Sequence, residues 1–255
     1  MTGLEKLTDV AHTDIIVIPI IDVSGSMYGT KIGQVNEAMA EVPSQLADIN
    51  DESVDSILRI APMEFSSGAR WFALKNDKPA EVESFRWIDM KASGLTDLGA
   101  AFKLLNEKLT VEEKGGWMKG RGGAAPILIL ISDGGPTDDY KSELEKLKKR
   151  GWFRSAVKFA VAVGADADKK VLAEFTGNIE AVIDTEMVRN ELSSIVKTVI
   201  VSASKTVSEG VSASNGGQLI KEVTDDGPDA DAQAQQDAID AVKDTLSMDD
   251  TDALF

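Results

Sequence analysis

The sequence predicts an α/β fold in which a doubly wound, mostly parallel sheet carries helices on both faces and one antiparallel edge strand. Short apolar runs of strand length alternate along the chain with segments whose apolar residues recur every three or four positions. The runs are apolar at nearly every position, as in strands that are covered on both faces. The polar turn 66–68 joins two of these runs, which predicts a hairpin and therefore the antiparallel edge strand.

The first expected strand is 15–21 and the first expected helix is 32–46. Pro19 cannot donate a ladder hydrogen bond, so we expect a bulge there. Pro43 is expected to bend or shorten the end of the helix. The other expected elements are strands at 54–65, 69–74, 127–131, 156–163 and 181–183, and helices at 98–109, 139–150, 169–175 and 187–202. Residues 112–125, rich in Gly and Lys, are expected to form a loop.

The composition changes after about Ser202 and predicts two parts, a folded domain over 1–203 and an appendage over 204–255. The appendage begins with a small, polar segment of the linker type. Residues 224–255 hold ten aspartates and a single basic residue, which predicts a largely disordered acidic tail. Ile239, Val242 and Leu246 have helical spacing within this tail and could fold against a partner.

The composition also excludes several functions. A formal net charge of −16 argues against nucleic acid and anionic membrane as partners. The chain has no cysteine, and His12 is its one histidine, so thiolate metal sites, a histidine zinc site and a Ser/His/Asp triad lack their residues. The N-terminal segment does not resemble a signal peptide and no apolar run reaches 18 residues, so we expect a cytoplasmic protein, although leaderless export would leave the same pattern.

Oxygen-bearing side chains follow the expected strands at one edge of the sheet. Asp22, Ser24 and Ser26 come directly after the first strand, Asp133 follows the strand 127–131, and Thr96 precedes the helix 98–109. Ligands bind in open α/β sheets at the carboxyl ends of the strands. Hydroxyls and carboxylates without imidazole or thiolate suit a hard cation, so we expect Mg²⁺, with Mn²⁺ or Ca²⁺ as alternatives.

Such a site carries little negative charge for a divalent cation. An outside carboxylate could fill one coordination position, and the metal would then bridge two proteins. We therefore expect a protein partner that offers an acidic side chain to the metal. The pattern favours no particular oligomeric state.

Three motifs carry a resemblance to a known family. DVSGSM at 22–27 resembles the DxSxS signature of the von Willebrand factor A domain, GLTD at 94–97 resembles its threonine loop, and ISDGGPTDD at 131–139 resembles its second aspartate loop. The order and spacing of the motifs also agree, and the resemblance runs from about residue 14 to 201. Within the superfamily, the segments look most like the intracellular bacterial group typified by the tellurium-resistance protein TerY.

The resemblance implies a Rossmann-like fold with a metal-ion-dependent adhesion site. By motif, Ser24, Ser26 and Thr96 would be ligands, and Asp22 and Asp133 would join directly or through water. The TerY group is associated with tellurite and stress resistance and with kinase–phosphatase signalling modules, which implies a role of that kind.

Several of these residues could instead have a structural role, as helix caps. Ser26 and Thr96 precede helical patterns and could cap helices, and capping and ligation can coexist. Asp97 could add a charge to the site or cap the helix that follows it. Asp138 and Asp139 are expected to act as helix caps.

Three functions compete. The first is a binding module that holds a protein partner through the metal. The second is an enzyme, which we do not expect: a phosphatase of the haloacid-dehalogenase type needs a second acid where Ser24 stands, and neither a phosphate-binding GxxxxGK[ST] loop nor a GxSxG elbow occurs. The third is an assembly component that makes its contacts through the sheet edge or the tail, with the metal supporting only the fold.

Overall fold

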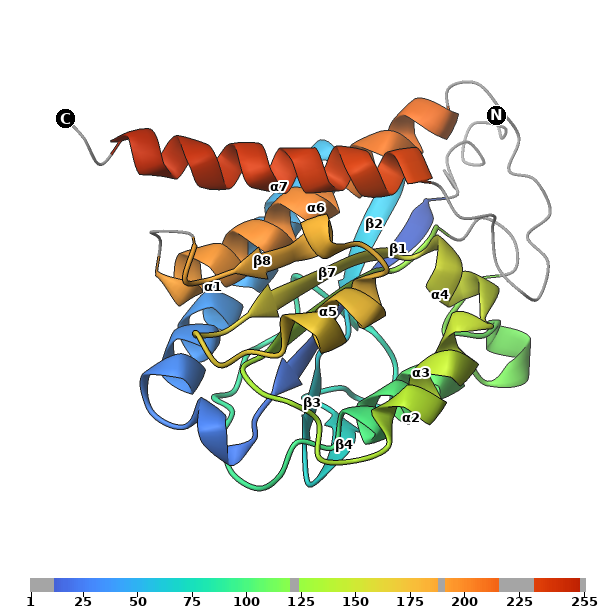
Figure 1. Cartoon of the computed structure of the whole chain (residues 1–255). Helices are drawn as coiled ribbons and strands as arrows, with labels where there is room; N and C mark the ends of the chain where they lie inside the picture. Colours follow the sequence, from blue (N-terminus) through green and yellow to red (C-terminus); the bar gives the residue numbers. More distant parts are fainter. Residues whose placement is uncertain (1–11, 120–123, 188–190, 216–231, 253–255) are drawn as a thin grey trace, which may run out of the picture.

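The computed structural model describes residues 12–119, 124–187, 191–215 and 232–252 (Figure 1). A mixed sheet runs through its centre in the order β4-β3-β1-β6-β7-β8, with β2 also paired to β1 and β5 paired to β2. Neighbouring strands are parallel except for the antiparallel pairs β3–β4 and β2–β5. The predicted fold class and the antiparallel edge strand are confirmed. The strands are β1 (Thr13–Asp22), β2 (Ser56–Ile60), β3 (Met63–Ser66), β4 (Gly68–Trp71), β5 (Ala80–Glu81), β6 (Ile127–Ser132), β7 (Val157–Ala162) and β8 (Val182–Asp184).

Helices cover both faces of this sheet. One face packs against α1 (Thr30–Glu52), α6 (Leu192–Asn215) and α7 (Ala232–Asp252). The other packs against α2 (Leu98–Lys108), α3 (Tyr140–Lys148), α4 (Gly151–Ser155) and α5 (Lys169–Thr176). Three short 3₁₀ helices lie in the connections, at η1 (Gly25–Met27), η2 (Glu112–Lys114) and η3 (Ile179–Ala181).

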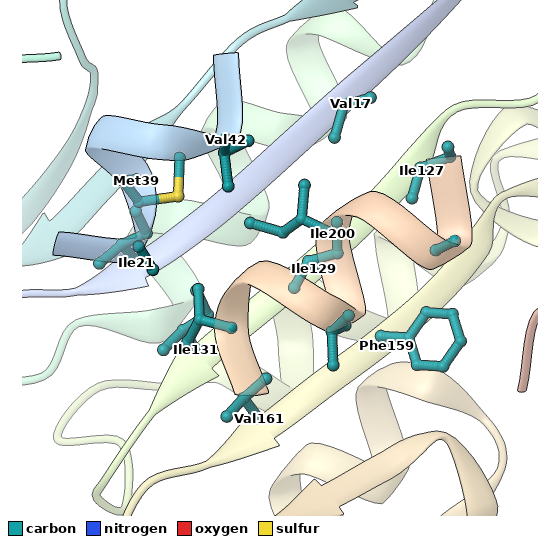
Figure 2. Packing of buried hydrophobic residues seen from close by; sticks show 14 of the residues in the cluster. Val17, Ile21, Met39, Val42, Ile127, Ile129, Ile131, Phe159, Val161 and Ile200 are labelled. Atoms are coloured by element: carbon teal, nitrogen blue, oxygen red, sulfur yellow. The ribbon is translucent and has the colours of Figure 1, made fainter. Parts of the chain in front are cut away.

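The central strands supply both halves of the core because successive side chains point to opposite faces. In β6, the isoleucines at 127, 129 and 131 join the cluster under α1 and α6, whereas the leucines at 128 and 130 join the cluster under α2. Figure 2 shows Ile200 of α6 packed among Val42 of α1 and Ile129 of β6. The nearly continuous apolar runs of the sequence are therefore strands buried on both faces.

Pro19 does not produce the predicted bulge. β1 is continuous through Pro19, which pairs with Ile129 of β6. Alternate residues of a parallel strand turn their backbone groups to the same neighbour, and the carbonyl of Val17 accepts the amide of Ala61 at 2.9 Å. Pro19 therefore turns its nitrogen toward the same side, where the neighbouring strand breaks between β2 and β3 at residues 61–62. Because the strand beside β1 is interrupted between β2 and β3, the N–H group that Pro19 lacks is not needed for a ladder hydrogen bond there.

Pro43 does not shorten the first helix. α1 continues to Glu52, and Leu46 and Ile49 beyond the proline are buried. The packing of these side chains against the sheet outweighs the one backbone hydrogen bond that the proline removes.

The expectation of a linker and a disordered tail over 204–255 is wrong for the part of it that the structure describes. α6 runs past Ala203 to Asn215, and residues 232–252 form α7, which lies across α6 (Figure 1). Ile239 and Val242 are fully buried and Leu246 is 5 % exposed. The apolar stripe that could have met a partner thus packs on this chain's own domain.

Two polar contacts fix the position of α7 on the sheet. The side-chain amide of Gln235 accepts from the backbone amide of Lys158 at 2.8 Å and donates to its carbonyl at 3.0 Å. Lys158 lies in β7 before the stretch 160–162 that pairs with β8, so Gln235 satisfies backbone groups that β8 does not reach. Among the described helices, none is both long and apolar enough to cross a bilayer.

Candidate metal centre

The predicted site residues come from three loops at the carboxyl ends of the central strands. β1 ends at Asp22, and β6, its parallel neighbour, ends at Ser132, directly before Asp133. Because Ile21 pairs with Ile131, the two aspartates emerge side by side from adjacent strands. The chain after Asp22 turns at once into η1, which keeps Ser24 and Ser26 at the same edge.

Four of the five predicted residues form one hydrogen-bonded chain, in which one link uses a backbone amide. The Oδ1 atom of Asp22 accepts the backbone amide of Ser24 at 2.8 Å, and the hydroxyls of Ser24 and Ser26 are 3.0 Å apart. The Ser26 hydroxyl then donates to Oδ1 of Asp133 at 2.6 Å. The structure therefore brings the DxSxS segment and the second aspartate loop into direct contact.

Asp22 lies at the buried end of this chain. It is fully buried, and its Oδ2 atom accepts a hydrogen bond from the Ser132 hydroxyl at 2.7 Å. Burial raises the pKa of Asp22 most strongly, and the nearby charge of Asp133 raises it further, while the hydrogen bonds from Ser132 and Ser24 act in the opposite direction. A cation placed between the two carboxylates would relieve both of the effects that disfavour the ionised form.

Thr96 joins the site through its backbone. The Gly25 amide donates to the carbonyl of Gly94 at 3.1 Å, and the Thr137 amide donates to the carbonyl of Thr96 at 2.8 Å, which ties the three loops together. Gly94 has φ +87°, and a Cβ atom there would lie 2.7 Å from the Ser67 hydroxyl oxygen, so the turn requires glycine. Thr96 is 8 % exposed, and its hydroxyl makes no hydrogen bond within the described residues.

The structure resolves the alternatives for the neighbouring residues. The N-cap positions of α1 and α2 are Gly29 and Asp97, so neither Ser26 nor Thr96 caps these helices. Asp97 makes no capping hydrogen bond; instead, it accepts from the amide of Gly68 at 2.9 Å and holds the β3–β4 turn against the threonine loop.

The expected caps at 138 and 139 occur, but on different helices. Asp139 accepts from the amide of Ser142 and caps α3, the helix that it precedes. Asp138 reaches across to α2 and accepts from the amides of Gly99 at 2.9 Å and Ala100 at 3.0 Å. Asp138 therefore fixes the start of α2 and, with it, the threonine loop.

Lys31 is a residue of the site that the motifs did not predict. It lies in the first turn of α1, and its ammonium group forms an ion pair with Oδ2 of Asp133. Asp133 is 3 % exposed, so this ion pair stands at the edge of the buried set. The one signal in the sequence was the position of Lys31 at the start of a helix that begins beside the DxSxS segment. Ser132 was missed as well, although it directly precedes Asp133.

The donor set fits a hard divalent cation. The site gathers two buried carboxylates and three hydroxyls and offers neither nitrogen nor sulfur from a histidine or cysteine. Within the described ranges, no three acidic, histidine or cysteine side chains cluster in a way that could hold a metal. A metal here would therefore rely on hydroxyl ligands, as the sequence predicts.

The surroundings of the site are apolar and open. Among the exposed large apolar side chains of the described residues are Tyr28 at 80 % and Leu95 at 59 %, which belong to the first and second site loops. A groove of about 700 Å³ lies between the β3–β4 hairpin and the segment 88–93, and its lining mixes charged and polar side chains with Val23 and the exposed Ile88. The edge therefore combines buried polar ligands with an exposed apolar rim.

Comparison with known proteins places the greater part of the chain in one family. A family model described as the von Willebrand factor type A domain matches residues 14–198. The inter-alpha-trypsin inhibitor heavy chain H2 of Mesocricetus auratus is 28 % identical over 160 residues, which is 60 % of this chain and 16 % of the relative.

Solved structures show the same fold at low identity. A von Willebrand factor type A protein from Catenulispora acidiphila has a TM-score of 0.53 at 15 % identity and covers 77 % of this chain and 43 % of its own. Proximal thread matrix protein 1 from the mussel byssus, in a form with a zinc-occupied MIDAS motif, has a TM-score of 0.54 at 16 % identity and covers 77 % of this chain and 48 % of its own. The chain spans 16 % of that curated relative and less than half of either structure.

Proposed function

Because the chain belongs to the von Willebrand factor type A domain family, we propose that it is a metal-dependent protein-binding module. The observation that carries the proposal is the hydrogen-bonded chain that joins the DxSxS segment to the second aspartate loop. The residues that would hold the metal are Asp22, Ser24, Ser26, Thr96 and Asp133.

The metal would supply a positive charge at which a carboxylate of the partner could bind. We expect Mg²⁺, with Mn²⁺ or Ca²⁺ as alternatives, because all the ligands are hard oxygen atoms. A charge-assisted contact is stronger where water is excluded, and Tyr28 and Leu95 would exclude it around an incoming acidic side chain. The partner's segment would therefore pair an acidic residue with apolar neighbours.

The position of α7 favours the metal edge over the tail as the contact surface. The apolar stripe formed by Ile239, Val242 and Leu246, which the sequence offers as a contact surface of the tail, is buried against the domain. A partner could reach it only by displacing α7. The assembly role that would use this stripe is therefore the weaker alternative.

We also propose that the protein is not an enzyme and that it acts in the cytoplasm. The site offers no histidine or cysteine as a poised base, and Ser24 stands where a phosphatase of the haloacid-dehalogenase type needs an acid. The motifs resemble those of the TerY group, so a stress-response, tellurite-resistance or kinase–phosphatase signalling system is the setting that we propose.

Calorimetric titration of the full chain with Mg²⁺ tests the site. We expect one binding event in the wild type and in Asp48→Ala, which removes an exposed aspartate of α1, and no binding in Asp22→Ala. An equal response of Asp22→Ala and the wild type would overturn the assignment. Capture of partners in Mg²⁺ and in EDTA then tests whether binding requires the metal, and retention of the partner by both Asp22→Ala and EDTA-treated protein would contradict the proposed function.

A further inference from the structure

We propose that Lys31 is a built-in counter-ion that competes with the divalent metal for Asp133 and so sets the metal affinity of the site. The inference rests on the proposed function, because it concerns the regulation of the same site. It starts from the ion pair between the Lys31 ammonium and Oδ2 of Asp133.

All four carboxylate oxygens of the site are occupied by this chain's own groups. The oxygens of Asp22 accept from the Ser24 amide and the Ser132 hydroxyl. Those of Asp133 accept from Ser26 and Lys31. Lys31 is the only formal positive charge among these four donors, so it neutralises the carboxylate that the metal would need.

The charge on Lys31 opposes a second cation at the same place. A divalent ion in contact with Asp133 would lie within a few ångströms of the ammonium group, and in a partly buried site this repulsion costs far more than it would in water. The ammonium must therefore leave Asp133, or share it at reduced affinity, when a metal binds.

Lys31 has room to move away. Its side chain is 37 % exposed, whereas that of Asp133 is 1 % exposed, so the lysine is the mobile member of the pair. Gly164, which follows β7, lies beside it, and a Cβ atom at this glycine would stand 3.6 Å from the ammonium nitrogen. The end of the Lys31 side chain therefore borders a position without a side chain.

Mg²⁺ titration by calorimetry tests the competition, with folding of each variant checked by circular dichroism. We expect Lys31→Met to bind Mg²⁺ about tenfold more tightly than the wild type, because the repulsion is gone. Lys31→Arg keeps the charge and should retain the wild-type affinity. Lys103→Met, which removes an exposed lysine of α2, should do the same and controls for net charge.

Thermal melting in EDTA gives a second, metal-free readout. Lys31→Met should lower the melting temperature of the wild type by about 3 °C, because Asp133 loses its counter-ion. In an Asp133→Asn background the same substitution should have no effect, since there is no charge left to neutralise. An equal effect in both backgrounds would overturn the assignment of Lys31 as the counter-ion.

The outcomes also separate this inference from the proposed function. If the wild type binds Mg²⁺ and Lys31→Met binds it equally or more weakly, Lys31 does not compete, and this inference fails while the metal site stands. Binding of Mg²⁺ by Lys31→Met but not by the wild type would support the proposal, because Lys31 would then exclude the metal from the wild-type site. Binding by neither variant would overturn both proposals.

Discussion

Asp138 shows how one side chain can hold two loops of the site. It accepts the amides of Gly99 and Ala100 at the start of α2, although it belongs to the loop before α3. Asp138→Ala should destabilise the protein by about 1–2 kcal/mol, because two amides lose their acceptor. Urea unfolding measures this loss. Asp139→Ala, which removes the exposed cap of α3, is the matched variant and should cost less; a larger loss in Asp139→Ala would contradict the assignment.

Lys158 gives a prediction about pH. It is 9 % exposed, its ammonium group donates to the carbonyls of Phe153 and Ala156, and burial lowers its pKa from 10.5 to about 8. Between these two values the unfolded chain binds the proton more tightly than the folded one, so the free energy of unfolding should rise with pH. From pH 7 to 10 the wild type should gain about 2 kcal/mol relative to Lys158→Met. A difference between the two proteins that stays constant with pH would contradict the prediction.

The motifs predicted most of the site residues, but not the contacts that depend on side-chain geometry. Spacing within DxSxS and the order of the loops pointed to five residues, and the structure places four of them in one hydrogen-bonded chain. That they bind a metal stays a prediction. Lys31 and Ser132 were missed because their roles depend on how far a side chain reaches across a loop, which no spacing rule encodes.

At the scale of helices and strands, α7 is the element that most needs a test. Ile239 is fully buried in it, so Ile239→Ala should lower the free energy of unfolding by about 2–4 kcal/mol through lost burial and a new cavity. Asp244→Ala changes an exposed residue of the same helix and should have little effect. Equal stability of Ile239→Ala and the wild type in urea would mean that α7 does not pack on the domain in solution.

The strands and the first half of α6 were predictable, but the second half of α6 and the whole of α7 were not. A continuous apolar run such as 127–131 is stable as a central strand of a sheet that is covered on both faces. Residues 204–215 and 232–252 instead carry many small and acidic residues, which resemble a linker and a disordered tail when only composition is considered. Their structure comes from tertiary contacts, in which a narrow stripe of buried side chains and the two Gln235 hydrogen bonds hold α7 in place.

For the molecule as a whole, the C-terminal segment should contribute to stability. A chain that ends at Asn215 loses α7 and exposes the surface of α6 that Ile239, Val242 and Leu246 cover. Burial of these side chains contributes about 4 kcal/mol, so the shortened chain should melt about 10 °C below the full chain. Differential scanning calorimetry measures the shift, and coincident melting curves would show that the segment is dispensable.

The placement of α7 also determines which surface of an anchored molecule is free to bind a partner. α7 is fixed near the beginning of β7, through Lys158, whereas the candidate metal centre lies where β1 and β6 end. A support that holds the molecule by the start of α7 would therefore leave the metal edge facing outward. Copies anchored side by side in this way should hold a partner that has several acidic segments by avidity, far more tightly than a single copy could.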